Sequence, residues 1–310
     1  MAENTKIEWA HHTFNPWIGC TKIGPGCDNC YAERWAEQRG GVRWGVGQPR
    51  RRTATSNWNQ IRRIHRRNAE AGTRERVFVA SLADWADQEV PDAWRKDLFD
   101  LIAECPSLDF LLLTKRIGVA RRMLPWMQPE ADGTPWPNVW LGVTVANQTD
   151  ADRDIDALLD TPAAVRFLSM EPLLGPVDLD RAMPADAALG WIIVGGESGP
   201  HARPLHPAWA RAIRDQCHER DIPFLFKQWG EWAPQGRMVN DLPEPLEGGE
   251  GVMLLNEHGE FCRPGSGTGF STGQEPEIMR RVGKVEAGRV LDGCFWDGVP
   301  ASPAAKLQPA

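Results

Sequence analysis

Three of the seven cysteines lie close together near the start of the sequence: Cys20, Cys27 and Cys30, in a C-x6-C-x2-C spacing. The string GPG at 24–26 predicts a tight loop that can wrap around a compact object. Cys30 opens a helical pattern, and a helix N-terminus favours thiolates. Three thiolates can hold three irons of a [4Fe–4S] cluster and leave the fourth iron open to the amino and carboxylate groups of S-adenosylmethionine (SAM). Reduction of such a cluster would cleave the sulfonium of SAM and release a 5′-deoxyadenosyl radical.

Two other interpretations of the three cysteines stay open. A structural zinc ion needs four ligands, and His11 or His12 would complete a Cys3His set. The cysteines could also be free of metal. A disulfide framework is not expected, because the total is odd and the remaining cysteines are scattered: Cys105, Cys217, Cys262 and Cys294.

The rest of the sequence predicts the elements that position this loop. Most apolar runs are continuous, which is typical of parallel strands buried on both faces. Helical patterns alternate with these runs, which predicts repeated βαβ units. The fold class is therefore α/β: a partial (β/α)6-type, TIM-like barrel of six or seven strands, with a doubly wound sheet as the alternative. The expected strands are Thr13–Trp17, Val77–Leu82, Phe110–Thr114, Val139–Val145, Val165–Met170, Trp191–Val194 and Phe224–Phe226, and the expected helices include Asp92–Glu104, Asp150–Leu159 and Pro207–Arg220.

The pattern changes near Glu231, where glycine and proline become frequent. We assign residues 1–230 to the barrel, including the cluster loop and a basic insertion at 41–76. Residues 231–310 are expected to form an irregular extension that packs on the barrel.

Polar residues recur where the predicted strands end. An α/β barrel places its chemistry at the carboxyl ends of its strands, so these residues are expected to surround one site. Lys227 and Gln228 fit either this ring or packing at the other end of the barrel. The candidate cofactor-binding residues are Ser81, Asp84, Lys115, Glu171, Gly195, Gly196 and Glu197.

Charge is unevenly distributed along the chain. The net charge is −7, yet residues 41–76 carry ten arginines against two acidic residues, a local excess of +8. Such a concentration suits a surface that faces phosphates. The candidate DNA-binding residues are Arg62, Arg63, Arg66 and Arg67, for which a solvated helix face is the alternative.

No apolar run reaches the length of about 18 residues that a membrane helix needs. The N-terminal string MAENTKIEWAHH does not resemble a signal peptide. We therefore expect no membrane partner and a cytoplasmic location.

The string from Ile7 to Glu33 is similar to the start of a phage and bacterial family whose members are often labelled only as phage proteins of unknown function. Further strings occur in that family in the same order: LLLTKR, NVWLGVTV, FLSMEPLLGP, WIIVGGESGPHARP and FLFKQWG. The resemblance covers about residues 5–298. The family resembles radical SAM enzymes in its partial barrel and cluster loop. It differs in a first spacer of six residues rather than three, and in an aromatic residue, Tyr31, that follows the last cysteine.

The resemblance implies a [4Fe–4S] cluster on Cys20, Cys27 and Cys30, with SAM as the second cofactor. The Gly195-Gly196-Glu197 string resembles the element that binds the SAM amino group, although it lies on a late strand. Ser81 and Asp84 stand at the usual strand position. An electron donor such as flavodoxin or ferredoxin is implied as a partner.

In phages that hypermodify thymidine, a radical SAM protein of this kind is associated with an isomerisation on the DNA base. The resemblance therefore implies conversion of 5-(N-α-glycyl)thymidine to its C-α-linked isomer, which helps the viral genome evade host restriction. DNA carrying the modified thymidine would be the partner, in the host cytoplasm if a phage encodes the chain. Two alternatives remain: a radical SAM lyase that repairs DNA, resembling photoproduct lyases, and a zinc-stapled DNA-binding protein without catalysis.

Overall fold

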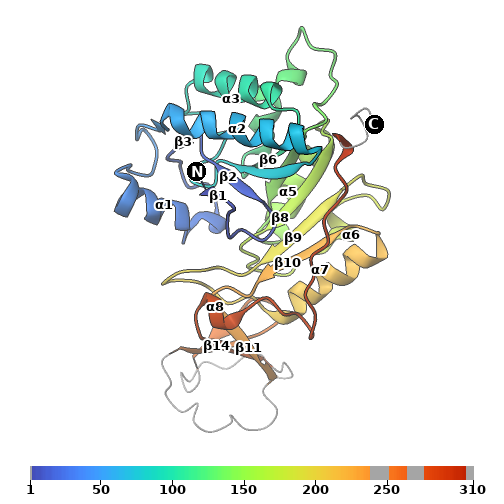
Figure 1. The fold of residues 1–310 in the computed structure, drawn as a ribbon. Helices are drawn as coiled ribbons and strands as arrows, with labels where there is room; N and C mark the ends of the chain where they lie inside the picture. Colours follow the sequence, from blue (N-terminus) through green and yellow to red (C-terminus); the bar gives the residue numbers. More distant parts are fainter. Residues whose placement is uncertain (1, 238–250, 264–275, 305–310) are drawn as a thin grey trace.

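The computed structural model describes residues 2–237, 251–263 and 276–304. At its centre is a sheet of eight strands in the order β1-β2-β5-β6-β7-β8-β9-β10 (Figure 1). The strands from β2 to β10 are parallel to one another, and only β1 runs antiparallel, at one edge. The sheet is therefore a curled half-barrel that stays open, which confirms the predicted fold class. Its strands are β1 Ala2–Glu3, β2 His12–Phe14, β5 Glu75–Val79, β6 Leu108–Thr114, β7 Val139–Thr144, β8 Val165–Met170, β9 Trp191–Gly195 and β10 Phe224–Gln228.

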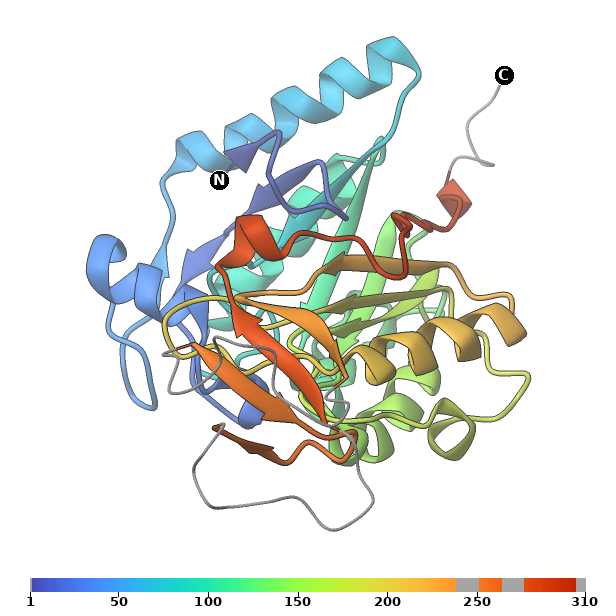
Figure 2. The ribbon, with the colours of Figure 1, turned by 90° about the horizontal axis from the view of Figure 1, so that it is seen from below.

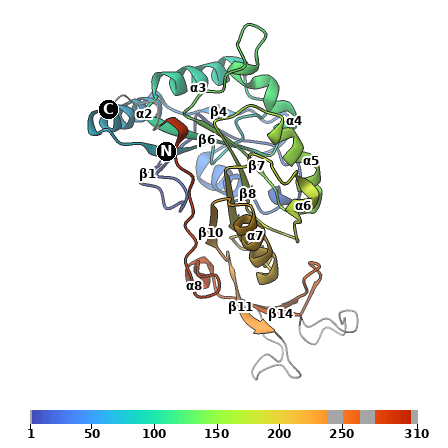
Figure 3. The ribbon, with the colours of Figure 1, turned by 90° about the vertical axis from the view of Figure 1, so that its right-hand side faces the viewer.

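Helices cover the outer face of this sheet (Figure 3). Their apolar sides form one core with the outward side chains of the strands, for example Leu98 and Ile213 with Val79 and Leu112. The basic stretch contributes a helix of 17 residues, α2, and four of its ten arginines lie on this helix: Arg62, Arg63, Arg66 and Arg67. The helices are α2 Thr55–Ala71, α3 Asp92–Glu104, α4 Ile117–Ala120, α5 Gln148–Leu159, α6 Leu179–Ala182 and α7 Pro207–Glu219.

A second, smaller core fills the concave face of the half-barrel. It is rich in aromatic rings: Trp140 and Trp191 lie 5.9 Å apart edge to face, and Trp191 lies 6.4 Å from Trp9. Gly142 leaves room here, because a Cβ at this position would lie 2.3 Å from the Phe167 ring. Both faces of the strands are thus buried, which explains why their sequences are apolar without alternation.

The cysteine segment follows the first parallel strand. Between β2 and α2 the chain forms β3 (Trp17–Ile18), a 3-10 turn (Pro25–Cys27), α1 (Tyr31–Trp35), a π-helical turn (Ala36–Gly40) and β4 (Arg51–Arg52). Gly19 forms a parallel bridge with Ala83, which lies just beyond β5. The loop is therefore held at the carboxyl end of the sheet.

The extension expected to be irregular contains a second sheet, antiparallel and of four strands, in the order β11-β14-β12-β13. It lies apart from α2 and α3 in Figures 1 and 3, and Figure 2 shows it from below. The glycine-rich strings at 244–252 and 263–273 fall largely outside the described residues. Within the described residues, no helix is long and apolar enough to cross a membrane. The added elements are β11 Trp232–Arg237, β12 Val252–Leu255, β13 Phe261–Cys262, β14 Glu277–Arg281 and α8 Lys284–Ala287.

Candidate functional site

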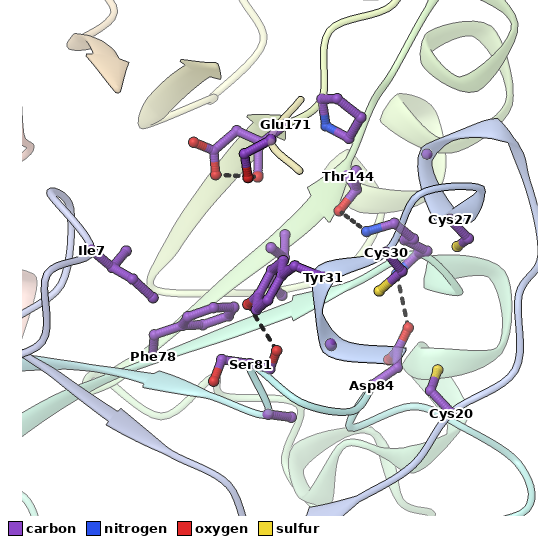
Figure 4. Close-up of a pocket in the computed structure, with 18 of the residues that line it drawn as sticks. Ile7, Cys20, Cys27, Cys30, Tyr31, Phe78, Ser81, Asp84, Thr144 and Glu171 are labelled. Carbon is purple, nitrogen blue, oxygen red and sulfur yellow. Dashed lines mark hydrogen bonds between the residues drawn. The ribbon is translucent and has the colours of Figure 1, made fainter. Parts of the chain in front are cut away.

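A cavity of about 500 Å³ opens beyond the carboxyl ends of the parallel strands (Figure 4). It brings together nine of the ten residues that the sequence predicts for the cluster and the cofactor. The tenth, Gly195, is buried directly behind it, where its absent Cβ would touch Glu171 and Lys227. The nine are Cys20, Cys27, Cys30, Ser81, Asp84, Lys115, Glu171, Gly196 and Glu197.

The three cysteines line one end of this cavity. Cys20 and Cys27 are buried and Cys30 is half-buried. Among the described residues, no three of the Cys, His, Asp and Glu side chains are arranged as a ready-made metal site. The chemistry of the donor set nevertheless fits an anionic iron–sulfur cluster, because three thiols share one cavity and the guanidinium of Arg116 lies 3.5 Å from the Cys20 sulfur.

The histidines of the zinc interpretation lie elsewhere. His12 is fully buried and its Nε2 lies 3.0 Å from the Glu75 carboxylate, at the amino end of β5. The Nδ1 of His11 accepts a hydrogen bond from the backbone N–H of Arg76 at the same end. The cysteines lie beyond the opposite ends of the strands, so neither histidine completes a Cys3His site here.

The Asp84 side chain is buried at the cavity wall and has several partners within the protein, and its predicted contact with the cofactor stays a prediction. Its carboxylate accepts hydrogen bonds from Thr114 Oγ1 at 2.8 Å and from the backbone N–H of Lys115 and Ala86. It also forms an ion pair of 2.8 Å with Arg116. Arg116 in turn donates to the backbone oxygen of Thr21. Asp84 therefore orients Arg116 against the cysteine segment.

Burial, together with the nearby Asp84 carboxylate, raises the pKa of the Cys20 thiol to about 12, while Arg116 opposes this. These surroundings favour the neutral thiol at Cys20. A thiolate at this position needs additional positive charge, which a bound metal centre would supply.

Lys115 is a cation in the cavity wall without a carboxylate partner among the described side chains. Its Nζ lies 3.2 Å from Thr144 Oγ1, and its stem lies beside Gly26 of the cysteine loop. Ser81 also lines the cavity, with its hydroxyl 3.0 Å from the Asn15 amide. Lys115 is therefore free to meet an anionic group, and Ser81 can offer a polar contact.

The Gly195-Gly196-Glu197 string has a clear packing role. A Cβ at Gly196 would lie 1.9 Å from the backbone oxygen of Trp229, so the two backbones touch. Glu197 is buried, and both of its oxygens accept hydrogen bonds from Arg203 and one also from Asn29. Glu197 also lines the cavity, and its predicted contact with the cofactor stays a prediction. In the structure the hydrogen bonds of its carboxylate go to protein groups.

Glu171 lies at the other end of the cavity from the cysteines (Figure 4). Lys227 approaches its two oxygens at 3.2 and 3.3 Å, and the Trp9 indole N–H and the Ser169 hydroxyl both lie 3.3 Å from Oε2. Lys227 thus belongs to the ring of strand ends and not to the far side of the barrel. Trp9 and Arg203 were missed, because neither follows a predicted strand end.

The predicted DNA-binding arginines lie on α2. Arg62 pairs with Glu104 at 2.7 Å, and Arg67 pairs with Glu3 and with Glu75, the first residue of β5. Arg63 and Arg66 are exposed, without an ion pair among the described residues. Glu75 and the cavity lie at opposite ends of β5, so this group lies away from the cavity. The local charge excess is also smaller than the sequence implies, because five of the ten arginines pair with a carboxylate: Arg50, Arg52, Arg62, Arg67 and Arg74.

Comparison with protein families matches residues 4–300 to the family described as "Protein of unknown function (DUF5131)". A comparison with curated proteins gives no match. Among solved structures, the chain is similar to a spore photoproduct lyase variant with bound AdoMet and a dinucleoside spore photoproduct, at 14% identity and a TM-score of 0.40. The alignment covers 67% of this chain and 61% of that chain, which is less than two thirds of its length.

Proposed function

The chain belongs to the DUF5131 family, and we propose that it is a radical SAM isomerase that acts on a glycyl-modified thymidine in DNA. One observation carries the proposal: three cysteines and six polar or glycine residues, all chosen from the sequence, line a single cavity at the carboxyl ends of parallel strands. This is the edge at which α/β barrels carry their chemistry.

In this proposal Cys20, Cys27 and Cys30 hold three irons of a [4Fe–4S] cluster, and SAM binds beside them. When bound, these groups supply the 5′-deoxyadenosyl radical. Arg116 contributes positive charge at 3.5 Å from the Cys20 sulfur. Lys115, the unpaired cation beside the loop, would hold the SAM carboxylate, and Ser81 would give a hydrogen bond to the same molecule. A small redox protein such as flavodoxin or ferredoxin would donate the electron.

The far end of the cavity suits the substrate. A glycyl substituent carries an amine and a carboxylate, and the Glu171–Lys227 pair offers one group of the opposite charge to each. Trp9 and Phe78 line the same end and give the base apolar surface. The overall change balances without a co-substrate. The methylene carbon on the base loses its bond to nitrogen and gains a bond to the glycyl α-carbon. One hydrogen of the α-carbon moves to the nitrogen.

Anaerobic reconstitution with iron and sulfide tests the proposal. The wild-type chain should bind about four irons and cleave SAM under reduction, and a variant with Cys20, Cys27 and Cys30 replaced by Ala should do neither. Cys105→Ala is the matched control, because Cys105 is buried in the outer core away from the cavity. It should keep its iron.

Nucleosides from DNA that is co-produced with the enzyme and with the glycyl-thymidine substrate then identify the reaction by mass and chromatography. A product of unchanged mass and altered retention supports the isomerase. One tightly held zinc ion and no SAM cleavage would overturn the proposal that the chain is an enzyme. Repair of dinucleotide lesions would show a lyase activity in place of the isomerase activity.

A further inference from the structure

The cysteine loop depends on a distant segment for its position. Residues 24–29 bond to one another through tight turns, such as Cys27 N–H to the Gly24 oxygen and Asp28 N–H to the Pro25 oxygen. In the described part of the chain, all their hydrogen bonds to distant residues go to three residues beyond β9: Glu197, His201 and Arg203. Within the described residues, the long-range hydrogen bonds of this loop therefore come from one segment.

Arg203 is the centre of this support. Its guanidinium donates to the Pro25 oxygen at 2.7 Å and to the Asp28 carboxylate at 3.0 Å, and it pairs with Glu197 at 2.7 Å. Asn29, between the second and third cysteines, donates to Glu197 at 2.9 Å. We call Arg203, Glu197 and Asn29 the clamp.

We propose that Arg203 is a positioning residue, and that the clamp fixes the cysteine loop in the arrangement that holds a cluster. A surface ion pair contributes little, but Glu197 is 6% exposed and its partners are charge-assisted donors in a fork geometry. The positioning of the cluster rests on the proposed function, whereas the fixing of the loop is a property of the protein alone.

The C-terminal extension supports the segment that carries Arg203 of the clamp. The Trp232 indole N–H donates to the Ala202 oxygen at 2.7 Å, and the Glu231 carboxylate accepts from the Gly199 N–H at 2.8 Å. Arg281 of β14 donates to the Gly199 oxygen at 2.8 Å. The segment 199–203 thus lies between the cysteine loop and the strands β11 and β14, so the extension has a part in the site that its sequence does not suggest.

Hydrogen exchange of the metal-free protein tests the clamp directly. Arg203→Ala should speed exchange of the hydrogen-bonded amides of Cys27, Asp28 and Cys30 by about tenfold or more while distant strands keep their protection. Arg203→Lys should give an intermediate result, because one ammonium cannot reach Glu197, Asp28 and the Pro25 oxygen together. Arg211→Ala is the matched control: it removes an arginine that pairs with Asp292 on the outside of α7. Unchanged exchange in the loop of the Arg203→Ala variant would overturn the proposal.

Trp232→Phe keeps the test decisive if Arg203→Ala does not fold. It removes the indole N–H to Ala202 and part of a buried ring, and it should raise exchange in the loop by a smaller factor. A loop that exchanges at the wild-type rate in this variant would overturn the support from the C-terminal sheet. Reconstitution gives the second readout. Arg203→Ala should bind less iron than wild type, and full iron content in spite of faster exchange would overturn the positioning role.

A wild-type chain that binds no iron would overturn the proposed function and the positioning of the cluster. Faster exchange in Arg203→Ala would still establish that the clamp fixes the loop.

Discussion

The ammonium of Lys227 lies 3.2 and 3.3 Å from the two carboxylate oxygens of Glu171, at the end of the cavity that the cysteines do not occupy. Both side chains are mostly buried, with 18% and 12% of their surface exposed. Gly195 leaves room for both side chains, because a Cβ there would lie 3.0 Å from the Glu171 carboxylate and 3.5 Å from the Lys227 Cβ. A pair of opposite charges at the wall of a cavity can exchange its internal contact for a ligand that carries both charges.

Replacing either member of this pair should weaken substrate binding without affecting the SAM end of the cavity. In Lys227→Met we expect KM for the glycyl-modified nucleoside to rise about 10- to 100-fold, as one charge-assisted hydrogen bond of about 1.5–3 kcal/mol is lost. SAM cleavage without substrate should stay within about twofold of wild type. Steady-state kinetics and a SAM cleavage assay measure the two effects.

Lys96→Met controls for the loss of a lysine, since Lys96 pairs with Asp100 on the surface of α3. An equal loss of SAM cleavage and of substrate affinity in Lys227→Met would show that the pair belongs to the SAM end instead.

The two neighbouring glycines should respond differently to alanine. A methyl group at Gly196 would lie 1.9 Å from a backbone oxygen, which cannot move cheaply, whereas at Gly195 it meets the flexible Glu171 side chain at 3.0 Å. We expect Gly196→Ala to lower the free energy of unfolding by about 3 kcal/mol or more. Gly195→Ala should keep most of the stability and disturb substrate binding. Urea unfolding followed by circular dichroism measures the stability of both variants, and steady-state kinetics measure the substrate binding of Gly195→Ala.

Gly118→Ala is the control, because it lies in a helix with no neighbour within 4 Å of the added methyl group. It should be neutral or slightly stabilising. Equal stability of Gly196→Ala and Gly118→Ala would contradict the close backbone approach.

The sheet and the composition of the cavity could be predicted from the sequence because both follow from one rule. Parallel strands buried on both faces appear as continuous apolar runs, and the polar residues that follow them, such as Asp84, Lys115 and Glu171, must meet at one edge. The predicted helix Asp92–Glu104 agrees with the structure at both ends.

The partners of these side chains could not be predicted in the same way. Glu197 follows a strand like the others, but its charge is matched by Arg203, which only the turn after β9 brings back to it. The Trp9 indole reaches Glu171 across 162 positions of sequence, from a segment with no strand pattern. Such contacts decide whether a polar side chain at a strand end is free to bind a ligand or already has partners within the protein. The periodicity of the sequence contains no information about them.

The amino end of the sheet should make stability sensitive to acid. The Glu75 carboxylate is partly buried, which opposes its ionisation, but hydrogen bonds from Asn68, His12 and Arg67 outweigh this and lower its pKa to about 2. A carboxylate with a lowered pKa in the folded state contributes stability above its ordinary pKa of 4.5, and this contribution is lost as the pH falls toward about 2. Glu75→Gln should therefore lower the free energy of unfolding by about 1–2 kcal/mol at pH 7 and by less as the pH approaches 3.

Urea titrations at several pH values between 7 and 3 measure this difference. Glu104→Gln serves as the control, because Glu104 is about half exposed and has one partner, Arg62. A stability difference for Glu75→Gln that does not change with pH would contradict the lowered pKa.

Ion pairing separates the four arginines of α2 into two pairs. Arg63 and Arg66 are exposed and free of ion pairs within the described residues, whereas Arg62 and Arg67 are already matched by carboxylates. Each arginine that neutralises a phosphate adds about 0.9 to the slope of log affinity against log salt concentration. We propose that Arg63 and Arg66 are the pair that contacts DNA, so replacing both by Gln should weaken duplex binding and reduce this slope by about 2. Replacing Arg62 and Arg67 by Gln should change DNA affinity less and stability more.

Because α2 lies away from the cavity, turnover of the free modified nucleoside should be unchanged in the Arg63 and Arg66 variant. Fluorescence anisotropy with labelled duplex between about 50 and 200 mM salt gives the slopes, and an unchanged slope in that variant would exclude α2 as the DNA-binding surface.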